Sequence, residues 1–211
     1  MAAMLRLYDY WESGNAYKVR LLLSQIGIPF ERVHLDVLER ETKTPEYLAK
    51  TPYGRVPMVE WPDGRRLTES GAILFHLAQG TPYLPDDPWD RAHVLQWMFF
   101  EQNGHEPYIA VVRWWHHAGI VDEKKAELPH RVERGYEALG VMEAQLTGRE
   151  FFVADRYTIA DIALYAYTHC AAEGGFHLER FPNVQAWLDR VARQPGHVAL
   201  PAEVGQLVSW P

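Results

Sequence analysis

The sequence contains a single cysteine, Cys170, among its 211 residues. One cysteine cannot form a disulfide within the chain, so a disulfide-stapled framework is excluded. No apolar run approaches the roughly 20 residues needed to span a bilayer, and residues 1–9 lack the pattern of a secretory signal. These absences lead us to expect a cytoplasmic protein, in a compartment where thiols stay reduced.

Positive charge is also scarce. The chain has 21 lysines and arginines against 28 aspartates and glutamates, which gives a formal net charge of -7. This balance argues against a broad nucleic-acid-binding surface. Hydrophobic residues make up 47% and charged residues 23% of the chain, as in ordinary packed proteins. The length predicts one or two domains with a sizeable core.

The first eighty residues alternate between short apolar strands and helices. Hydrophobic residues recur with period two in the strand candidates and at helical spacing in the helix candidates. Pro62-Asp63-Gly64 indicates a hairpin turn. The predicted order is β-α-β-α-β-β-α, with strands near 4–8, 33–37, 56–61 and 66–68, and helices near 17–25, 44–48 and 70–78.

The remainder of the chain reads as helical. Residues 80–87 are rich in proline and aspartate and indicate a linker. Helical patterns follow over 89–117, 123–146, 158–171 and 184–193, and we expect Gly104 and Pro107 to bend the first of them. The prediction is therefore an α/β domain over 1–80, a linker over 81–87 and an all-helical domain over 88–211.

Two motifs in the first half suggest a binding pocket. A proline inside an apolar strand, as in Val56-Pro57, gives up a ladder hydrogen bond and leaves the Val56 backbone able to pair with an extended peptide. Glu69-Ser70 then supplies a carboxylate, a hydroxyl and helix N–H groups. These groups are the ones needed to hold the amine and the carboxylate of an amino acid, so we expect a pocket for a small acidic peptide.

Four motifs in a fixed order carry a family resemblance. They are Ser13-Gly14-Asn15-Ala16-Tyr17-Lys18-Val19-Arg20 after the first strand, Val56-Pro57, Glu69-Ser70, and Thr158-Ile159-Ala160-Asp161. With them the chain resembles the cytosolic glutathione S-transferases over nearly its whole length. The resemblance implies a thioredoxin-like N-terminal domain followed by an all-helical C-terminal domain. The serine after the first strand resembles the serine-type branch, which includes theta, zeta and related bacterial forms.

The resemblance implies that Ser13 activates the thiol of glutathione. A free thiol has a pKa of about 8.5, and a hydroxyl donor at a helix N-terminus favours the thiolate. A purely structural role for Ser13 as a helix cap is the competing interpretation. Asn15, Tyr8 and Tyr10 are rival activating groups. No cysteine lies between Ser13 and Lys18, which argues against a mechanism with a mixed disulfide on the enzyme.

The resemblance also assigns the residues that bind glutathione. The backbone of Val56, before a cis bond to Pro57, would pair with the cysteinyl part. Ser70 would meet the γ-glutamyl carboxylate and Glu69 the ammonium. Arg55 and Lys43 would reach the carboxylates, or else are solvated surface residues. The full set of predicted glutathione-binding residues is Ser13, Lys43, Arg55, Val56, Pro57, Glu69 and Ser70.

The second substrate is expected between the two domains, over the long aromatic helix. Most aromatic residues at helical spacing are core, but a few facing a cleft would form an apolar pocket. The predicted lining residues are Tyr10, Trp97, His105, Tyr108 and Trp114.

Two further groups of residues are interpreted as structural. His116-His117 predict no metal site, because adjacent helix residues diverge in direction. Thr158 and Asp161 form a capping box, which makes Asp161 a folding residue.

The expected activity is conjugation of the glutathione thiolate, as a co-substrate without a metal, to a small and largely apolar electrophile. The family is usually homodimeric. Three alternatives remain: a glutathione-dependent isomerase of the zeta type, a peroxidase, and a non-enzymatic binding or regulatory protein on the same fold. Gly14 and Asn15 stand where the zeta signature has a serine and a cysteine, which weakens the isomerase alternative.

Overall fold

The structure, a computed structural model, describes residues 4–200. It has two compact units, residues 4–77 together with 195–200, and residues 78–194. The predicted order of elements in the first unit is confirmed. These elements are β1 (Leu5–Asp9), α1 (Gly14–Gln25), β2 (Phe30–His34), a 3-10 turn (Glu41–Lys43), α2 (Pro45–Leu48), β3 (Met58–Glu60), β4 (Arg66–Thr68) and α3 (Ser70–Leu77).

The four strands form one mixed sheet in the order β2-β1-β3-β4. β1 runs parallel to β2, and their connection passes through α1. β3 is antiparallel to both β1 and β4. The predicted hairpin joins β3 to β4, and Gly64 turns it with a φ of 83° while its N–H donates to the carbonyl of Trp61 at 2.9 Å. This topology and the helical second unit confirm the predicted thioredoxin-like and all-helical architecture.

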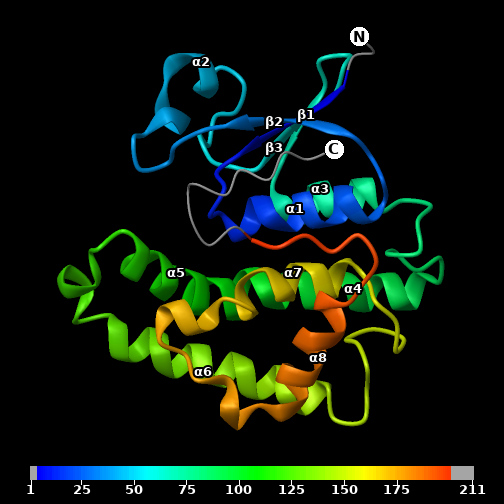
Figure 1. Cartoon of the computed structure of the whole chain (residues 1–211), viewed down its shortest axis with the longest axis vertical. Coiled ribbons are helices and arrows are strands. Elements are labelled where there is room, and N and C mark those ends of the chain that lie inside the picture. Colours follow the sequence, from blue (N-terminus) through cyan, green and yellow to red (C-terminus); the bar gives the residue numbers. More distant parts are fainter. Residues whose placement is uncertain (1–3, 201–211) are drawn as a thin grey trace. The chain divides into compact units, whose positions relative to one another are not determined.

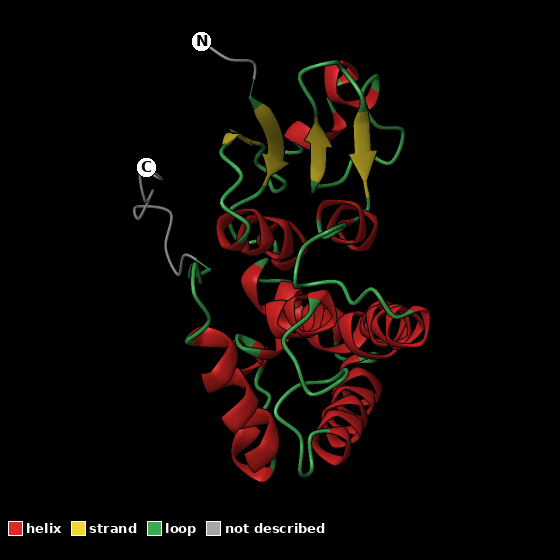
Figure 2. Ribbon diagram, turned by 90° about the vertical axis from the view of Figure 1, so that its right-hand side faces the viewer, coloured by secondary structure: helices red, strands yellow, loops and turns green. Residues whose placement is uncertain are grey.

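Alternation along β1 gives the sheet two buried faces. Leu5 and Leu7 face α1 and α3, where they pack with Val19 and Ile73. Tyr8 faces the other way and packs with residues such as Met58, on the side of α2. Figures 1 and 2 show the sheet with α1 and α3 side by side on one face, and Figure 1 shows α2 on the other.

Helix α1 is buried over most of its surface: nine of its twelve residues are buried. It begins at Gly14, three residues before the predicted start. Ser13 precedes it in an extended conformation, and Ser13 Oγ accepts a hydrogen bond from the N–H of Ala16 at 3.2 Å. The cap therefore sets the first turn before the apolar periodicity begins.

The segment 195–200 joins the first unit and runs past α1 (Figure 1). Tyr17 Oη donates to the carbonyl of Val198 at 2.7 Å, and Ser24 Oγ donates to the carbonyl of Gly196 at 2.8 Å. Gly196 has a φ of +71°, and a Cβ there would lie 3.0 Å from Gln25 Cα. The sequence prediction assigned these residues to the helical domain, since the segment carries no periodic pattern that would link it to α1.

The second unit is helical, and the segment predicted as one bent helix over 89–117 has three parts. A π-helical turn that contains Gly104 interrupts it, and Pro107, the other residue expected to bend it, lies in the first turn of the helix that follows. No helix within residues 4–200 is long and apolar enough to cross a membrane. The elements are α4 (Pro88–Phe100), the π-helical turn (Glu101–His105), α5 (Glu106–His117), α6 (Leu128–Gln145), α7 (Ile159–Thr168), α8 (Pro182–Ala192) and 3-10 turns at Val121–Lys124, Ala171–Gly174 and Leu178–Arg180.

A buried carboxylate organises the start of α7. Asp161, which has no exposed surface, accepts hydrogen bonds from the N–H of Thr158 at 2.8 Å and from its hydroxyl at 3.1 Å. It also accepts from the N–H of Phe152 at 3.2 Å and from Trp187 Nε1 at 3.0 Å. Burial raises the pKa of Asp161 to about 6, and the hydrogen bonds from these donors oppose that rise. The predicted capping role is confirmed, and it extends to α8 through Trp187.

Substitution Asp161→Asn tests this role. The side-chain amide of asparagine would point its N–H groups at groups that now donate hydrogen bonds to the carboxylate. At least one of these hydrogen bonds would therefore be lost. We expect the free energy of unfolding at neutral pH to fall by roughly 1–3 kcal/mol, measured by urea denaturation. Asp189→Asn, at an exposed ion pair on α8, is the control and should change stability by less than about 0.5 kcal/mol. Equal effects in the two variants would contradict the role of Asp161.

Substitution Tyr17→Phe tests the contact between α1 and the C-terminal segment. Loss of the hydroxyl leaves the carbonyl of Val198 without this donor, and we expect a loss of about 1 kcal/mol of stability. Tyr53→Phe removes the same atom from a side chain that is 64% exposed and should have little effect. If urea denaturation gives the two variants the same midpoint, the Tyr17 contact contributes nothing measurable.

Candidate functional site

The first unit brings together residues that are far apart in the sequence. Ser70, the first residue of α3, donates from Oγ to Asn15 Oδ1 in the first turn of α1 at 3.1 Å. The N-termini of the two helices are thereby joined by one hydrogen bond. Neither helix has an acidic residue in its first turn. The partial positive charge that gathers at a helix N-terminus is therefore not offset there by the helices' own side chains, which suits an external anion.

Lys18 fixes the orientation of Asn15. Its Nζ donates to Asn15 Oδ1 at 2.8 Å. An ammonium can only donate, so this contact identifies the oxygen of the amide and directs its NH₂ group elsewhere. Lys18 is only 1% exposed, and the sequence interpretation missed it. The available signal was a charged residue inside an apolar helical run, which has to be paired when buried.

Ser13 keeps its hydroxyl hydrogen available while it caps α1. The cap uses an acceptor lone pair of Oγ, which receives the N–H of Ala16. A hydroxyl has one hydrogen to donate in addition to two acceptor sites. The structural role and the predicted role in thiol activation are therefore compatible at this half-buried residue.

The two tyrosine rivals have carboxylate partners. Tyr8 Oη donates to Glu60 Oε2 at 2.6 Å and accepts from Lys50 Nζ at 2.8 Å, on the face of the sheet that α2 covers. Tyr8 is therefore committed to a different network. Tyr10 is 4% exposed and its hydroxyl lies 3.4 Å from Glu12 Oε2. This contact is longer than those of Tyr8, so Tyr10 remains a rival to Ser13.

The bond between Val56 and Pro57 is cis, as the resemblance implied. The loop before it is held by side chains at its carbonyl groups. Lys43 Nζ donates to the carbonyls of Tyr53 at 3.0 Å and Gly54 at 2.6 Å. Lys43 was predicted to bind a ligand carboxylate, and in this structure its ammonium braces the loop that carries Val56.

The same loop is held from a second side, through Arg55. Tyr47 Oη donates to the carbonyl of Arg55 at 2.8 Å. Burial raises the pKa of Tyr47, so its phenol stays protonated and can donate. A Cβ at Gly54 would lie 2.5 Å from the carbonyl oxygen of Thr42, which is too close for any other residue. The Arg55 side chain itself is exposed.

Glu69 has a left-handed backbone conformation, with φ at 67°. This conformation costs a non-glycine residue on the order of 1–2 kcal/mol, and such costs are concentrated at functional sites. The carbonyl of Glu69 accepts the N–H of Ile73 at 2.9 Å and so opens α3. Ser70 lies within the helix as its first residue and gives its hydroxyl to Asn15. The Glu69 side chain is exposed beside it.

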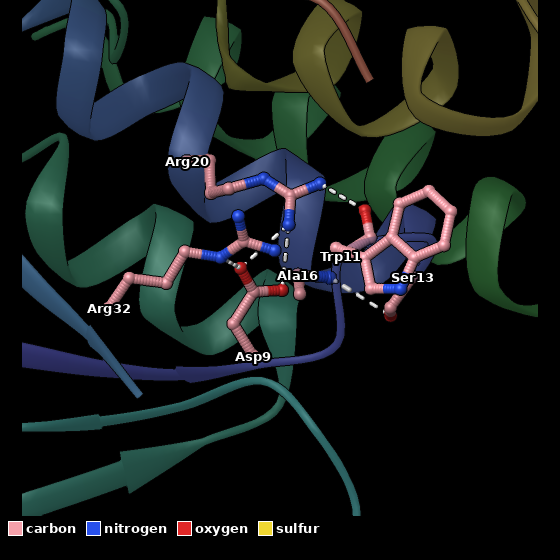
Figure 3. Close-up of polar contacts among 6 residues, drawn as sticks. All are labelled: Asp9, Trp11, Ser13, Ala16, Arg20 and Arg32. Carbon is pink, nitrogen blue, oxygen red and sulfur yellow. Dashed lines mark hydrogen bonds and ion pairs between the residues drawn. The ribbon is translucent and has the colours of Figure 1, made fainter. Parts of the chain in front are cut away.

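A buried ion cluster lies under the loop that carries Ser13 (Figure 3). Arg20 Nη1 contacts Asp9 Oδ1 at 2.7 Å and Oδ2 at 2.6 Å, and Arg20 Nη2 donates to the carbonyl of Trp11 at 2.8 Å. Arg32 Nε contacts the same Asp9 Oδ2 from β2. Asp9 has no exposed surface and Arg20 is 1% exposed. The sequence interpretation assigned no role to these three residues.

The predicted second-substrate residues are divided between the two units. Tyr10 belongs to the first unit, and the other four belong to the second. Trp97 packs against Phe152, with ring centroids 4.7 Å apart, and lines a hollow of about 240 Å³. Tyr108 lines a different hollow, of about 440 Å³. Trp114 is half-buried beside His117. A shared pocket for these residues remains a prediction.

His105 requires a correction. It has no exposed surface, and its Nε2 lies 2.9 Å from Thr168 Oγ1. Thr168 donates its only hydroxyl hydrogen to the carbonyl of Leu164 at 2.7 Å, so it accepts from His105. A side chain with no exposed surface offers no atom to a ligand, and we do not retain His105 in the proposed pocket.

The single cysteine has a role in packing. Cys170 is buried, and burial raises the pKa of its thiol to about 12, so it stays protonated. Among residues 4–200, no group of three or more histidine, cysteine, aspartate or glutamate side chains is arranged to hold a metal ion.

The chain is similar to known proteins over most of its length. The sequence matches the family "Glutathione S-transferase, N-terminal domain" over residues 3–79 and "Glutathione S-transferase, C-terminal domain" over residues 90–195. A glutathione S-transferase from Pseudomonas fluorescens has 48% identity, with coverage of 94% of this chain and 99% of that one and a TM-score of 0.91.

Two further matches bear on ligand and function. A glutathione transferase from Burkholderia graminis, solved with two glutathione molecules bound per subunit, has 31% identity, coverage of 92% and 85%, and a TM-score of 0.81. The transcriptional regulator URE2 of Saccharomyces cerevisiae is 28% identical over 90% of this chain and 65% of its own length. The two family matches span most of the sequence, and the chain belongs to the glutathione S-transferase family.

Proposed function

We propose that this protein is a glutathione transferase that joins the sulfur of glutathione to an electrophilic carbon of a small, largely apolar molecule. The observation that carries the proposal is the hydrogen bond between Ser70 and Asn15. It unites the predicted thiol-activating helix end with the predicted γ-glutamyl site, although 55 residues separate them. Separate structural roles for the two motifs would not require this contact.

Thiol activation follows from the N-terminus of α1. Ser13 retains a hydrogen that can be donated to the thiolate while Oγ caps the helix. The dipole of α1 also favours the anion, and no acidic side chain in the first turn of the helix offsets this effect. Each unit by which the thiol pKa falls requires about 1.4 kcal/mol of preferential stabilisation of the thiolate. The thiolate sulfur then forms a bond to the electrophilic carbon. In a substitution the carbon–leaving-group bond breaks and its electron pair departs with the leaving group; in an addition a π bond of the electrophile breaks and its electron pair takes up a proton.

Glutathione would lie along the loop and the helix entrance. The Val56 backbone would pair with the cysteinyl unit, next to the cis bond to Pro57. The γ-glutamyl carboxylate would bind the N-terminus of α3 at Ser70, and its ammonium would be drawn to Glu69. Arg55, exposed on the same loop, is the proposed partner of a glutathione carboxylate.

A non-enzymatic role is the second candidate, favoured by the similarity to the transcriptional regulator URE2. Isomerase and peroxidase activities would use the same thiolate with other substrates. We also propose a cytoplasmic homodimer, as the family resemblance implies. Light scattering that gives the mass of one 24.4 kDa chain would overturn the dimer.

Titration of glutathione into the pure protein at neutral pH tests the function. We expect saturable heat of binding together with ultraviolet absorbance from bound thiolate. S-methylglutathione is the matched control, since it has the same carboxylates and amine but no ionisable thiol. Binding without thiolate absorbance favours the non-enzymatic role. If millimolar glutathione does not bind, the transferase proposal is refuted.

Substitution Ser13→Ala should separate activation from capping. We expect turnover at neutral pH to fall about tenfold as the bound thiol's pKa rises by about one unit, and stability to fall by about 1 kcal/mol with loss of the cap. Ser13→Thr keeps both the cap and the hydroxyl and should retain turnover. Unchanged turnover in Ser13→Ala would reject Ser13 as the activating group.

Substitution Ser70→Ala should act on affinity instead. The Kd of glutathione is expected to rise about tenfold, the effect of losing a hydrogen bond near a charged ligand. Ser24→Ala removes another hydroxyl from the first unit, bonded to Gly196 at the far end of α1, and should leave the Kd unchanged. An unaltered Kd in Ser70→Ala, measured by calorimetry, would remove Ser70 from the binding site.

A further inference from the structure

A single guanidinium holds the loop that presents Ser13. Arg20 contacts both oxygens of Asp9, the last residue of β1, through Nη1. Its Nη2 donates to the carbonyl of Trp11, in the middle of the connection between β1 and α1. Figure 3 shows Arg20 reaching both partners, and Ser13 follows Trp11 by two residues along the chain. The end of the strand and the loop are thus tied to the helix that the loop enters.

The hydrogen bonds from Arg20 to Asp9 and Trp11 limit where the Ser13 hydroxyl can lie. The N–H of Ser13 donates to the carbonyl of Tyr10 at 2.9 Å and closes a turn around Trp11. On the far side, Ser13 Oγ accepts from the N–H of Ala16. Arg20 adds a hydrogen bond to this turn, from its Nη2 to the carbonyl of Trp11. Ser13 is therefore positioned by α1 from both sides.

This arrangement depends on the planar, forked guanidinium of Arg20. A guanidinium presents donors in a rigid plane and can meet a carboxylate and a carbonyl at once. A lysine ammonium keeps the charge but is a single point, and it cannot reach both partners with the same geometry. Both Asp9 and Arg20 are buried, so water does not substitute for a lost contact.

A second arginine in the cluster makes no described hydrogen bond to the loop. Arg32 binds Asp9 Oδ2 from β2, and its Nη2 is buried without a hydrogen-bond partner among the described atoms. The three side chains thus carry two positive charges and one negative charge. Arg32 offers a matched comparison, because it shares the carboxylate of Asp9 but makes no hydrogen bond to Trp11.

We propose that Arg20 is a positioning residue for thiol activation: it holds the carbonyl of Trp11, and through it the Ser13 hydroxyl, where that hydroxyl donates to the glutathione thiolate. The inference rests on the proposed function. It assigns Arg20 no contact with glutathione, since its described hydrogen bonds are to Asp9 and Trp11. Arg20 should therefore affect ionisation of the bound thiol far more than glutathione affinity.

Arg20→Lys is the test, with thiolate absorbance recorded against pH in the presence of saturating glutathione. We expect the apparent pKa of the bound thiol to rise by about one unit and kcat at neutral pH to fall about tenfold. Turnover should recover at higher pH, where the thiol ionises without help. The Kd of glutathione should stay within about twofold of the wild-type value. A general loss of folded structure would not produce recovery with pH.

Two companion variants make the result decisive. Arg32→Met should leave the thiol pKa unchanged, and a shift as large as that in Arg20→Lys would overturn the positioning role in favour of a bulk charge effect. In a Ser13→Ala background, Arg20→Lys should cause no further shift, because the hydroxyl that it positions is gone. An additional full shift there would also overturn the proposal.

The outcome for the wild-type protein separates this inference from the function on which it rests. If wild-type protein gives no thiolate signal, the proposed transferase function fails and the inference fails with it. If wild-type protein gives the signal and folded Arg20→Lys gives the same pKa, only the inference fails. Should Arg20→Lys not fold, Asp9→Asn loosens the same tie from its other end while keeping the shape of both partners, and the same shift is expected.

Discussion

The burial of α1 is the constraint on which the rest of the site depends. A buried helix cannot leave its polar side chains to water, because an unpaired buried polar group costs about 1–3 kcal/mol. Asn15, Lys18 and Arg20 lie on this helix within a few residues of its N-terminus. Lys18 pairs with Asn15 on the same helix, whereas Asn15 and Arg20 also bind parts of the first unit outside the helix, at Ser70, Asp9 and Trp11. Satisfying the helix and assembling the site are therefore one process.

The partners of α1 come from three separate segments. Ser70 belongs to α3, Asp9 to β1 and Val198 to the end of the described chain. Two of these contacts fix segments whose own local structure is weakly determined, the entrance of α3 and the irregular stretch at Val198, and the third holds the end of β1. A change in any of these partners alters a contact of α1. Because α1 also holds the loop that carries Ser13, the change can reach that loop through the helix.

Local features of the fold could be predicted from the sequence because local chemistry determines them. The hairpin follows from Pro62-Asp63-Gly64, and the start of α7 follows from the spacing of Thr158 and Asp161. The order of strands and helices follows from hydrophobic periodicity alone. The cis bond between Val56 and Pro57 could be predicted only from the family resemblance, because few peptide bonds before proline are cis.

Other features depend on contacts between distant residues and have no local signature. Nothing near Lys43 in the sequence indicates that its ammonium would bind the carbonyls of Tyr53 and Gly54. The aromatic pattern around His105 is equally compatible with a pocket wall and with the interior, and the bond to Thr168 decides for the interior. Lys18 and Arg20 were visible as charges in an apolar helix, but their partners could not be identified before the fold was known.

The return of residues 195–200 to the first unit makes the helical unit an insertion within it. Two covalent connections join the units, one after Leu77 and one before Pro195. During synthesis, the first unit therefore cannot make its contact at Tyr17 until the whole helical unit has left the ribosome. Its sheet and helices precede that moment by more than a hundred residues, so α1 has to wait for its last partner while the second unit folds.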